Sequence, residues 1–339
     1  MADIRRFLDN KFALKRDRAI YEAERRKHEL LGKITELSEI ETELSLAGVR
    51  YAQALLNDAN ISLADEYLIK MDLLNKKKEQ ILLANNIPTD YLEPKFLCKL
   101  CDDRGYVQSN GASVPCSCYK KLYLEHLYEV SNLLDDGKTG FDYFDETWYS
   151  DEVDSKKYLL DISPRAQINS VKEQCKEFIL KFTDNDTKNL YFYGLTGTGK
   201  TFMAKSIGLE LLKAGFSVLY LSATSLFSII QQYRLNFDRD GISGEQAYKN
   251  LISTNLLILD DLGTEPQSDS KYAELLTLLE LRTAQNKIRT AKTIIASNLN
   301  FKRLSQEYNE RIASRIVGDF QALQFVGDDI RIVKKLSGK

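Results

Sequence analysis

The stretch "YFYGLTGTGKT", residues 191–201, decides the fold of the second half of this chain. It fits the spacing G-x-x-x-x-G-K-[ST], follows a strand-like run and opens a helical pattern. Glycines let the backbone curl so that several N–H groups face an anion at the N-terminus of a helix. The phosphates of a nucleotide suit such a loop, with Lys200 at the β- and γ-phosphates and the Thr201 hydroxyl on magnesium. The residues predicted to bind the nucleotide in this loop are Gly194, Thr196, Gly197, Thr198, Gly199, Lys200 and Thr201.

Polar residues end two further apolar runs. "NLLILDDLG" ends in Asp260 and Asp261, and "TIIASNLN" ends in Asn298. Ligands bind at the carboxyl ends of parallel strands, so we expect Asp260 in the magnesium shell and Asp261 orienting the attacking water. The alternative for the two acids is a buried strand that ends in an acidic turn. Asn298 could hydrogen-bond the γ-phosphate or the water, or it could be a plain turn residue.

From residue 166 onward, short strand-like runs alternate with helical stretches. The runs are 190–193, 218–221, 256–259, 293–296 and 322–326. This alternation is typical of a parallel sheet wrapped by helices. We therefore predict an α/β phosphate-loop domain, with helices on both faces of its sheet, over residues 166–339.

Residues 1–90 read as helices, because apolar residues recur at three- and four-residue steps. Nine Lys/Arg against six Asp/Glu in residues 1–29 indicate a solvated helix face or a docking surface for another protein. Two prolines in "NNIPTDYLEP" end the helices. We predict a partner-binding helical region over 1–90, a cysteine segment over 91–130 and a linker over 131–165.

Four of the five cysteines lie within 21 residues, as the pairs Cys98/Cys101 and Cys116/Cys118. The Asn110-Gly111 dipeptide between them predicts a two-residue hairpin turn, which would put Gly105 opposite Cys116 and bring the pairs together. Four converging thiolates suit a tetrahedral structural zinc ion. Paired disulfides, a redox-active C-x-x-C and an iron–sulfur cluster are the alternatives. The fifth cysteine, Cys175, is expected to be a buried thiol.

Composition narrows the class of protein. The chain has 339 residues, of which 43% are hydrophobic and 28% charged, as in a soluble protein with a buried core. Its apolar runs are too short to cross a bilayer, and its charged N-terminus lacks the core of a signal peptide. We expect a cytoplasmic protein. A net charge of −2 argues against a protein that coats nucleic acid by bulk attraction.

Taken together, "GLTGTGKT", "LLILDDLG", "IIASNL" and "ERIASRI" resemble the AAA+ ATPases. More specifically, they resemble bacterial replicative helicase loaders of the DnaC/DnaI type, within the IstB-like ATP-binding family. The cysteine segment followed by "CYKKLY" is similar to the zinc-bearing front half of DnaI-like members, and "FDYFDETWYSD" to the segment before their ATPase domain. Over residues 1–90 the resemblance rests only on helical character and position.

The resemblance implies roles for individual residues. Asp260 would be the Walker B aspartate and Asn298 the residue called sensor 1. Arg315 would be an arginine finger that completes a neighbouring subunit's site, with Arg311 as its companion, although two arginines four apart on a helix face usually form salt bridges. Arg331 in "GDDIRIVKK" resembles the sensor 2 arginine. ATP, Mg²⁺ and Zn²⁺ are the implied cofactors.

The implied function is ATP-dependent loading of the hexameric replicative helicase onto single-stranded DNA, by subunits that self-associate through the ATPase domain. A transposition helper ATPase is the alternative of the same fold. Asp261 stands where many AAA+ proteins have Glu, which favours a slow switch and keeps open an adaptor with a vestigial ATPase. A small-molecule kinase would leave the helical front half without a purpose.

The DNA contact is the least specific prediction. Arg234 and Arg239 lie near Tyr233 and Phe237 in the stretch after the second strand. These side chains could stack on bases or pair with a nucleic-acid backbone. Core packing with solvated charges explains the same pattern equally well.

Overall fold

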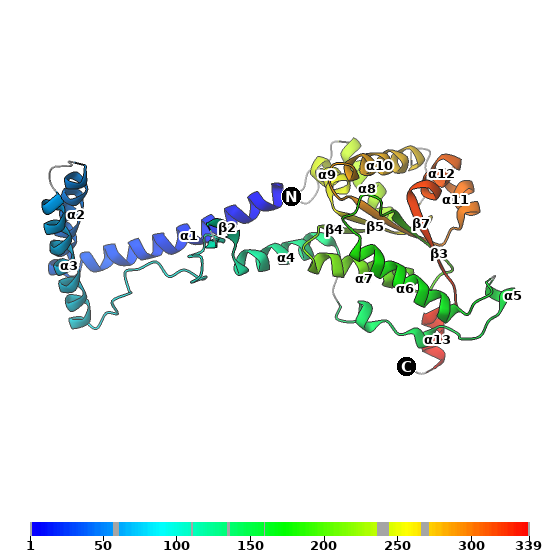
Figure 1. Ribbon diagram of the computed structural model, residues 1–339, viewed down its shortest axis with the longest axis horizontal. Helices are drawn as coiled ribbons and strands as arrows, with labels where there is room; N and C mark the ends of the chain where they lie inside the picture. Colours follow the sequence, from blue (N-terminus) through cyan, green and yellow to red (C-terminus); the bar gives the residue numbers. More distant parts are fainter. Residues whose placement is uncertain are drawn as a thin grey trace. The chain divides into compact units, whose positions relative to one another are not determined.

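The computed structural model describes residues 2–56, 61–109, 111–133, 136–158, 160–235, 244–265 and 271–337. The chain forms two compact units, Met1–Leu122 and Tyr123–Lys339 (Figure 1). The boundary falls within helix α4 (Ser117–Ser131). In the part of the chain that is described, no helix is both long and apolar enough to cross a bilayer.

Three helices dominate the first unit: α1 (Ala2–Leu31), α2 (Thr35–Leu55) and α3 (Ile61–Ala84). They confirm the predicted helical N-terminal region. Small side chains at Ala47, Ala54 and Ala64 are buried, which lets α2 and α3 approach closely. An ion-pair network joins the three helices, because the Glu41 carboxylate of α2 contacts Lys27 Nζ at 2.5 Å and Lys78 Nζ at 2.6 Å.

A β-hairpin and the start of α4 pack on the first half of α1, away from the end of α1 that contacts α2. Strands β1 (Tyr106–Ser109) and β2 (Ala112–Pro115) pair antiparallel, with Ser109 opposite Ala112. Asn110 of the predicted turn lies outside the described residues. The Tyr119 ring stacks on Phe12 of α1 with ring centroids 5.5 Å apart. Gly105 has a φ of +80°, and an added Cβ there would stand 2.9 Å from Tyr119, so this position requires glycine.

Hydrogen bonds fix α1 to the loop between α3 and the hairpin. Arg26 donates to the carbonyl oxygens of Tyr91 at 2.9 Å and Glu93 at 2.8 Å, and Arg16 donates to the carbonyl oxygen of Asp102 at 3.3 Å. These bonds satisfy carbonyl oxygens of a segment that forms no helix or strand of its own.

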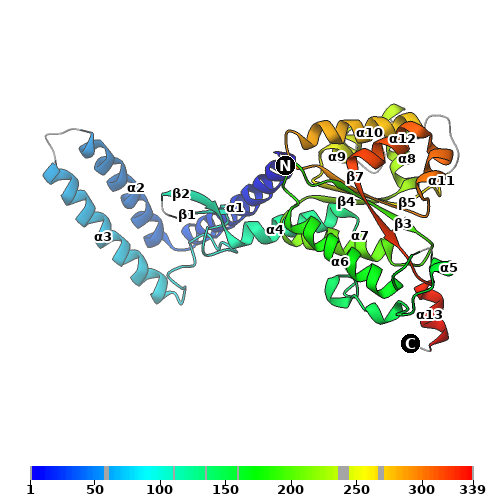
Figure 2. The same ribbon diagram turned by 45° about the vertical axis from the view of Figure 1, so that its right-hand side comes forward.

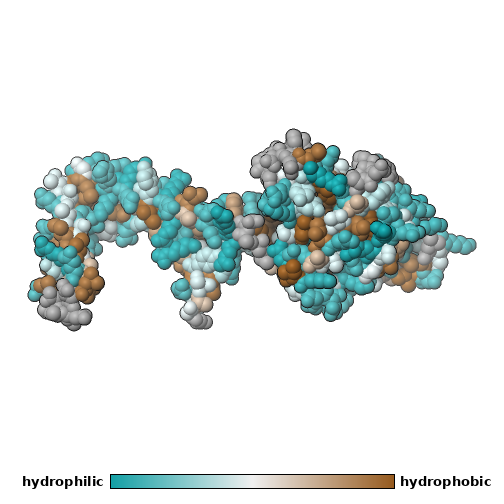
Figure 3. Space-filling model, turned by 90° about the horizontal axis from the view of Figure 1, so that it is seen from above, coloured by the Kyte–Doolittle hydropathy of each residue, from teal (hydrophilic) through white to brown (hydrophobic). Residues whose placement is uncertain are grey.

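Figure 3 shows small apolar patches among polar surface on one face of the molecule.

The second unit is built on a five-stranded sheet of order β4-β5-β6-β3-β7, in which every neighbouring pair is parallel. The strands are β3 (Asn189–Gly194), β4 (Val218–Ser222), β5 (Leu256–Leu262), β6 (Lys292–Ser297) and β7 (Phe320–Phe325). All five predicted runs overlap these strands. The predicted parallel α/β architecture is therefore confirmed.

Helices cover both faces of the sheet (Figure 2). On one face lie α6 (Pro164–Leu180) and α7 (Lys200–Lys213). The other carries α8 (Ala223–Arg234), α9 (Gly244–Ser253), α10 (Lys271–Asn286), α11 (Phe301–Tyr308) and α12 (Glu310–Asp319). Short helices η1 (Phe141–Tyr143), η2 (Glu146–Trp148), α5 (Ser155–Tyr158) and α13 (Ile330–Leu336) complete the unit.

A buried arginine ties the amino-terminal ends of the sheet strands to the helices. Arg282 of α10 is 1% exposed. Its guanidinium donates to Thr293 Oγ1 and to the carbonyl oxygens of Leu251, Ile252, Thr254 and Lys292, at 2.6–3.2 Å. Burial lowers the pKa of Arg282 to about 9, so the side chain remains charged at neutral pH. Five oxygen acceptors compensate a charge that has been removed from water.

Candidate nucleotide site and cysteine cluster

The phosphate-loop motif joins β3 to α7, as the sequence predicts. Gly194 has a φ of +151°, and an added Cβ would stand 2.0 Å from the carbonyl oxygen of Phe325 on the neighbouring strand. Gly199 has a φ of +92°, and its Cβ would stand 2.5 Å from the Tyr149 hydroxyl. Glycine is required at both positions because side chains would meet backbone or a packed ring.

Lys200 begins α7 and points back into the loop. Its Nζ donates to the carbonyl oxygens of Gly194 at 2.9 Å and Leu195 at 2.7 Å. The residue is 6% exposed, and burial lowers the pKa of Lys200 to about 8, against the opposite effect of Asp261 and Asp260. The loop thus holds one partly desolvated cation where a phosphate could replace its carbonyl partners.

The carboxyl ends of β5 and β6 bring Asp260, Asp261 and Asn298 next to this loop. Asp260 is 3% exposed, and its Oδ1 accepts from the Asp261 backbone N–H at 3.0 Å. Asp261 has a φ of +55°, a left-handed conformation that Asp tolerates better than most residues. Burial and the charge of Asp260 raise the pKa of Asp261. The Asp260 carboxylate and the Thr201 hydroxyl offer the oxygen donors that Mg²⁺ prefers, so these two residues fit that ion.

A cavity of about 350 Å³ opens over the loop. Among the predicted residues it is lined by Thr196, Gly197, Thr198, Gly199, Lys200, Thr201, Asp261, Asn298 and Arg331. Gly194 and Asp260 adjoin it through their contacts with Lys200 and Asp261. The structure therefore gathers residues spread over more than 130 positions around one cavity.

Sequence reasoning missed an aromatic wall of this cavity. Tyr143, Phe144, Trp148 and Tyr149 line it, although they lie in the range predicted as a linker. The Tyr149 hydroxyl donates to the carbonyl oxygen of Thr198 in the loop at 3.1 Å. Four aromatic residues within seven positions were the signal that could have revealed the wall, because aromatic rings offer faces on which a base can stack.

The C-terminal helix α13 closes the same cavity. Arg331 and Lys334 line it, and Lys334 Nζ stands 5.0 Å from the centroid of the Trp148 ring. The backbone N–H of Ile330 donates to the carbonyl oxygen of Gly197 at 3.0 Å. Segments from both ends of the second unit therefore meet at the loop.

Arg311 and Arg315 lie elsewhere, in a groove between α10 and α12. Arg315 contacts Glu280 of α10 at 3.3 Å and Asp319 of its own helix at 3.4 Å. Arg311 is exposed. Within one subunit, Arg315 forms the salt bridges that its helical spacing predicts, and the groove is separate from the cavity over the phosphate loop.

The residues named for a DNA contact are only partly described. Tyr233 stacks on Tyr248 with centroids 4.2 Å apart, and Arg234 pairs with Glu274 at 2.7 Å. Phe237 and Arg239 lie outside the described residues. The two described side chains thus have partners within the domain, as expected for packing with solvated charges.

The model of the IstB-like ATP binding protein family matches residues 154–337, more than half of the chain. The chain belongs to this family. Its IstB-like domain therefore comprises the sheet, the phosphate loop and α13. The family is described as one of ATP-binding proteins.

Curated relatives cover the IstB-like domain only in part. YdaV of Escherichia coli (strain K12) is 31% identical over 128 residues, 38% of this chain and 48% of YdaV. The replicative helicase loader DnaC of the same strain is 27% identical over 152 residues, 44% of this chain and 58% of DnaC. The ATP-binding protein of insertion sequence IS232 from Bacillus thuringiensis subsp. berliner is 25% identical over 167 residues, 48% of this chain and 62% of that protein. The chain thus spans about half the length of the curated relatives it matches.

Solved structures also resemble the chain. AMPPCP-bound DnaA from Aquifex aeolicus has a TM-score of 0.45 at 20% identity, over 61% of this chain and 57% of DnaA. The crystal structure of DnaI has a TM-score of 0.39 at 22% identity, over 50% of this chain and 91% of DnaI.

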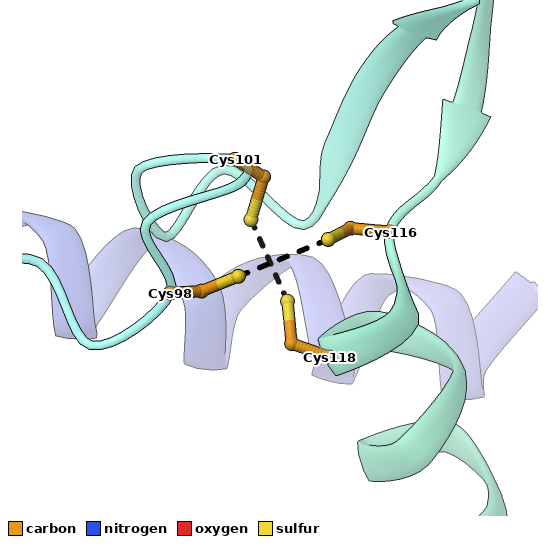
Figure 4. A group of neighbouring side chains, drawn as sticks. All are labelled: Cys98, Cys101, Cys116 and Cys118. Atoms are coloured by element: carbon orange, nitrogen blue, oxygen red, sulfur yellow. Dashed lines mark hydrogen bonds between the residues drawn. The ribbon is translucent and has the colours of Figure 1, made fainter.

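The cysteine cluster lies in the first unit and precedes the IstB-like domain in the sequence. Its four side chains point toward one another (Figure 4). The Cys116 backbone N–H donates to the Gly105 carbonyl oxygen at 2.8 Å, which confirms the predicted register. Sγ atoms of Cys98 and Cys116 are 3.8 Å apart, those of Cys101 and Cys118 are 3.5 Å apart, and all four lie within 4.8 Å of one another. A tetrahedral zinc ion with Zn–S bonds of about 2.3 Å sets sulfurs about 3.8 Å apart. The Cys98–Cys116 and Cys101–Cys118 separations lie close to that value, so the four thiols suit a tetrahedral zinc site.

A buried carboxylate supports the first cysteine pair. Asp103 is 2% exposed and accepts from the backbone N–H groups of Leu97 at 2.8 Å and Cys98 at 2.9 Å. A hydrogen bond from the Cys118 backbone N–H lowers the pKa of Cys116 to about 7, whereas burial raises the pKa of Cys101 and Cys118. A bound metal would deprotonate all four thiols.

Cys175 lies apart from this cluster. It is fully buried in α6, and burial raises its pKa, as expected for an inert thiol.

Proposed function

We propose that this protein is a cytoplasmic, ATP-dependent loader of the replicative DNA helicase onto single-stranded DNA. The observation that carries the proposal is the cavity that joins the phosphate loop to the ends of β5 and β6. The similarity of the IstB-like domain to the helicase loader DnaC supports the choice of process.

ATP would occupy the cavity over the phosphate loop. The loop N–H groups and Lys200 would bind its phosphates, while Thr201 and Asp260 would hold Mg²⁺. When bound, that ion neutralises charge on the β- and γ-phosphates. The rings of Phe144 and Trp148 would contact the nucleoside, and Arg331 lies on the same wall as a second cation for the phosphates.

Hydrolysis would be slow and would require a second subunit. Asp261 would orient water and Asn298 would contact it or the γ-phosphate. Asp261 is shorter than Glu, so water would be held less firmly and the nucleotide would act as a switch. Arg315, with Arg311 beside it, would enter the neighbour's site, because in its own subunit it lies in a different groove. Self-association through the IstB-like domain follows from that requirement.

The first unit would bind the helicase hexamer. Along α2 and α3, Val49, Leu68, Ile69 and Leu73 are all more than half exposed, which is unusual for apolar residues of a helix pair unless a partner covers them. Zinc at the cysteine cluster would hold the hairpin against α1 and so keep this unit in one shape.

Two alternatives keep a specific observation in their favour. A transposition helper ATPase is supported by the family match and by the similarity to the IS232 protein. An adaptor with a vestigial ATPase is supported by Asp261 in place of Glu. Both alternatives predict the nucleotide cavity. The transposition helper would differ from the loader in its protein partner, and the adaptor would differ in lacking ATP turnover.

The nucleotide step is tested first. The full chain should bind a fluorescent ATP analogue in the presence of Mg²⁺, and Lys200→Ala should abolish binding. Lys213→Ala is the matched control, because Lys213 is exposed at the far end of the same helix and pairs with Glu210. Wild-type protein that is folded and binds no adenine nucleotide would refute the proposal.

The loader step is tested with the replicative helicase of the same host. The full chain should co-purify with the helicase and place it on single-stranded DNA when ATP is present. Ile69→Glu with Leu73→Glu should abolish the complex, whereas Lys77→Glu, on the same helix and exposed, should not. Binding to a transposase but not to the helicase would favour the transposition helper, and loading without ATP turnover would favour the adaptor.

A further inference from the structure

The structure places a tyrosine against the acidic residue that is proposed to hold magnesium. Tyr220 lies on β4, the strand next to β5, and its hydroxyl donates to Asp260 Oδ2 at 2.6 Å. The register pairs Ser222 with Asp260, so Tyr220 stands two residues earlier on the adjacent strand. No motif in the sequence marks this tyrosine, because the contact joins residues 40 positions apart.

We propose that Tyr220 is a positioning residue that orients the Asp260 carboxylate for Mg²⁺. The proposal rests on the proposed nucleotide site and concerns how that site acquires its metal.

Both oxygens of Asp260 are held. Oδ2 accepts from the Tyr220 hydroxyl, and Oδ1 accepts from the Asp261 backbone N–H at 3.0 Å. These two bonds fix the plane of a carboxylate that is 3% exposed. A carboxylate has about four lone-pair positions, so two remain for a metal or for water bound to a metal. Mg²⁺ demands near-ideal octahedral geometry, and a ligand fixed in advance meets that demand at lower entropic cost.

The phenol ring is itself fixed. Val218 lies two residues before Tyr220 on β4. It faces Gly208 of α7, as does Ile258 of β5, so this part of the sheet lies under the phosphate-loop helix. From α7, Lys205 Nζ stands 4.9 Å from the centroid of the Tyr220 ring, and Lys205 also lines the nucleotide cavity.

Tyr220→Phe removes only the hydroxyl and keeps the ring under Lys205. Loss of a group that orients a metal ligand costs about 10- to 100-fold in metal affinity. We therefore expect the Mg²⁺ concentration that half-saturates the tightening of ATP-analogue binding to rise by about that factor. Affinity for the analogue in EDTA should stay within about twofold of wild type, because the phosphate loop is unchanged.

Tyr123→Phe is the matched control. The Tyr123 hydroxyl donates to the carbonyl oxygen of Gly215 at 3.2 Å in the same unit, away from the cavity. A Tyr220→Phe protein whose Mg²⁺ midpoint equals that of Tyr123→Phe, or lies below wild type, would overturn the inference. A variant weakened equally in EDTA and in Mg²⁺ would also overturn it, because that result reports a general structural role. Wild-type protein without nucleotide binding would instead reject the proposed function.

Discussion

Removal of metal from the cysteine cluster should unfold the β1–β2 hairpin and the cysteine loops locally, without unfolding the rest of the chain. The hairpin offers little to hold it without metal, because no residue of β1 or β2 is buried and a two-stranded hairpin alone is marginal in water. Zinc that binds only the folded segment, at about 1,000 times its Kd, stabilises that segment by about 4 kcal/mol relative to the unfolded form. We therefore expect a chelator to speed amide exchange in residues 96–121 by about 1,000-fold.

Hydrogen exchange with mass spectrometry measures this loss, and metal analysis measures the stoichiometry. The Leu97 and Cys98 amides, which donate to Asp103, and the Cys116 amide, which donates to Gly105, should lose protection. Cys101→Ser should reproduce the effect of the chelator. Cys175→Ser, at the buried thiol of α6, should keep one zinc per chain.

Purified protein that carries no zinc but still protects the hairpin amides would contradict this prediction. Iron and acid-labile sulfide in place of zinc would point to a cluster instead. Affinity should fall as pH falls, because the thiols must lose protons to bind the metal and burial raises the pKa of two of them.

Three further substitutions test other parts of the second unit. Asp261→Glu should lower the free energy of unfolding by about 1 kcal/mol, since Glu tolerates the positive φ less well, and phosphate release should accelerate, since the longer carboxylate would hold water more firmly. Glu280→Gln should raise turnover by about 1.5- to 5-fold at limiting protein concentration if the exposed pair restrains Arg315, and unchanged turnover would deny that restraint. Arg282→Met should cost about 3–5 kcal/mol in chemical denaturation, because buried oxygen acceptors that lose their donor cost about 1–3 kcal/mol each, whereas exposed Arg303→Met should cost less than about 0.5 kcal/mol.

Local patterns predicted much of the fold and of the candidate site. The five strand runs and the phosphate loop were readable because apolar periodicity and glycine spacing are properties of neighbouring residues. The hairpin register was readable for the same reason, since a two-residue turn fixes which residues face each other. Asp261 and Asn298 could be placed together because parallel strands end at one edge of a sheet.

Contacts between distant segments were not predictable in this way. Nothing near Trp148 in the sequence indicates that Lys334 lies over its ring, and nothing near Asp260 indicates Tyr220. The bond from Arg26 to the carbonyl oxygen of Tyr91 is of the same kind. Such pairs depend on how helices and strands pack, and periodicity within one segment carries no information about its partner in another.

The position of the aromatic wall has a practical consequence for anyone who prepares the second unit alone. A recombinant fragment that starts at residue 154, where the family match begins, would omit Tyr149 and with it the hydroxyl that caps the Thr198 carbonyl. Such a fragment would also leave Lys334 without the indole beneath it. Poor nucleotide uptake by that truncated form would reflect the site of the cut, and a start ahead of Thr139 avoids the artefact.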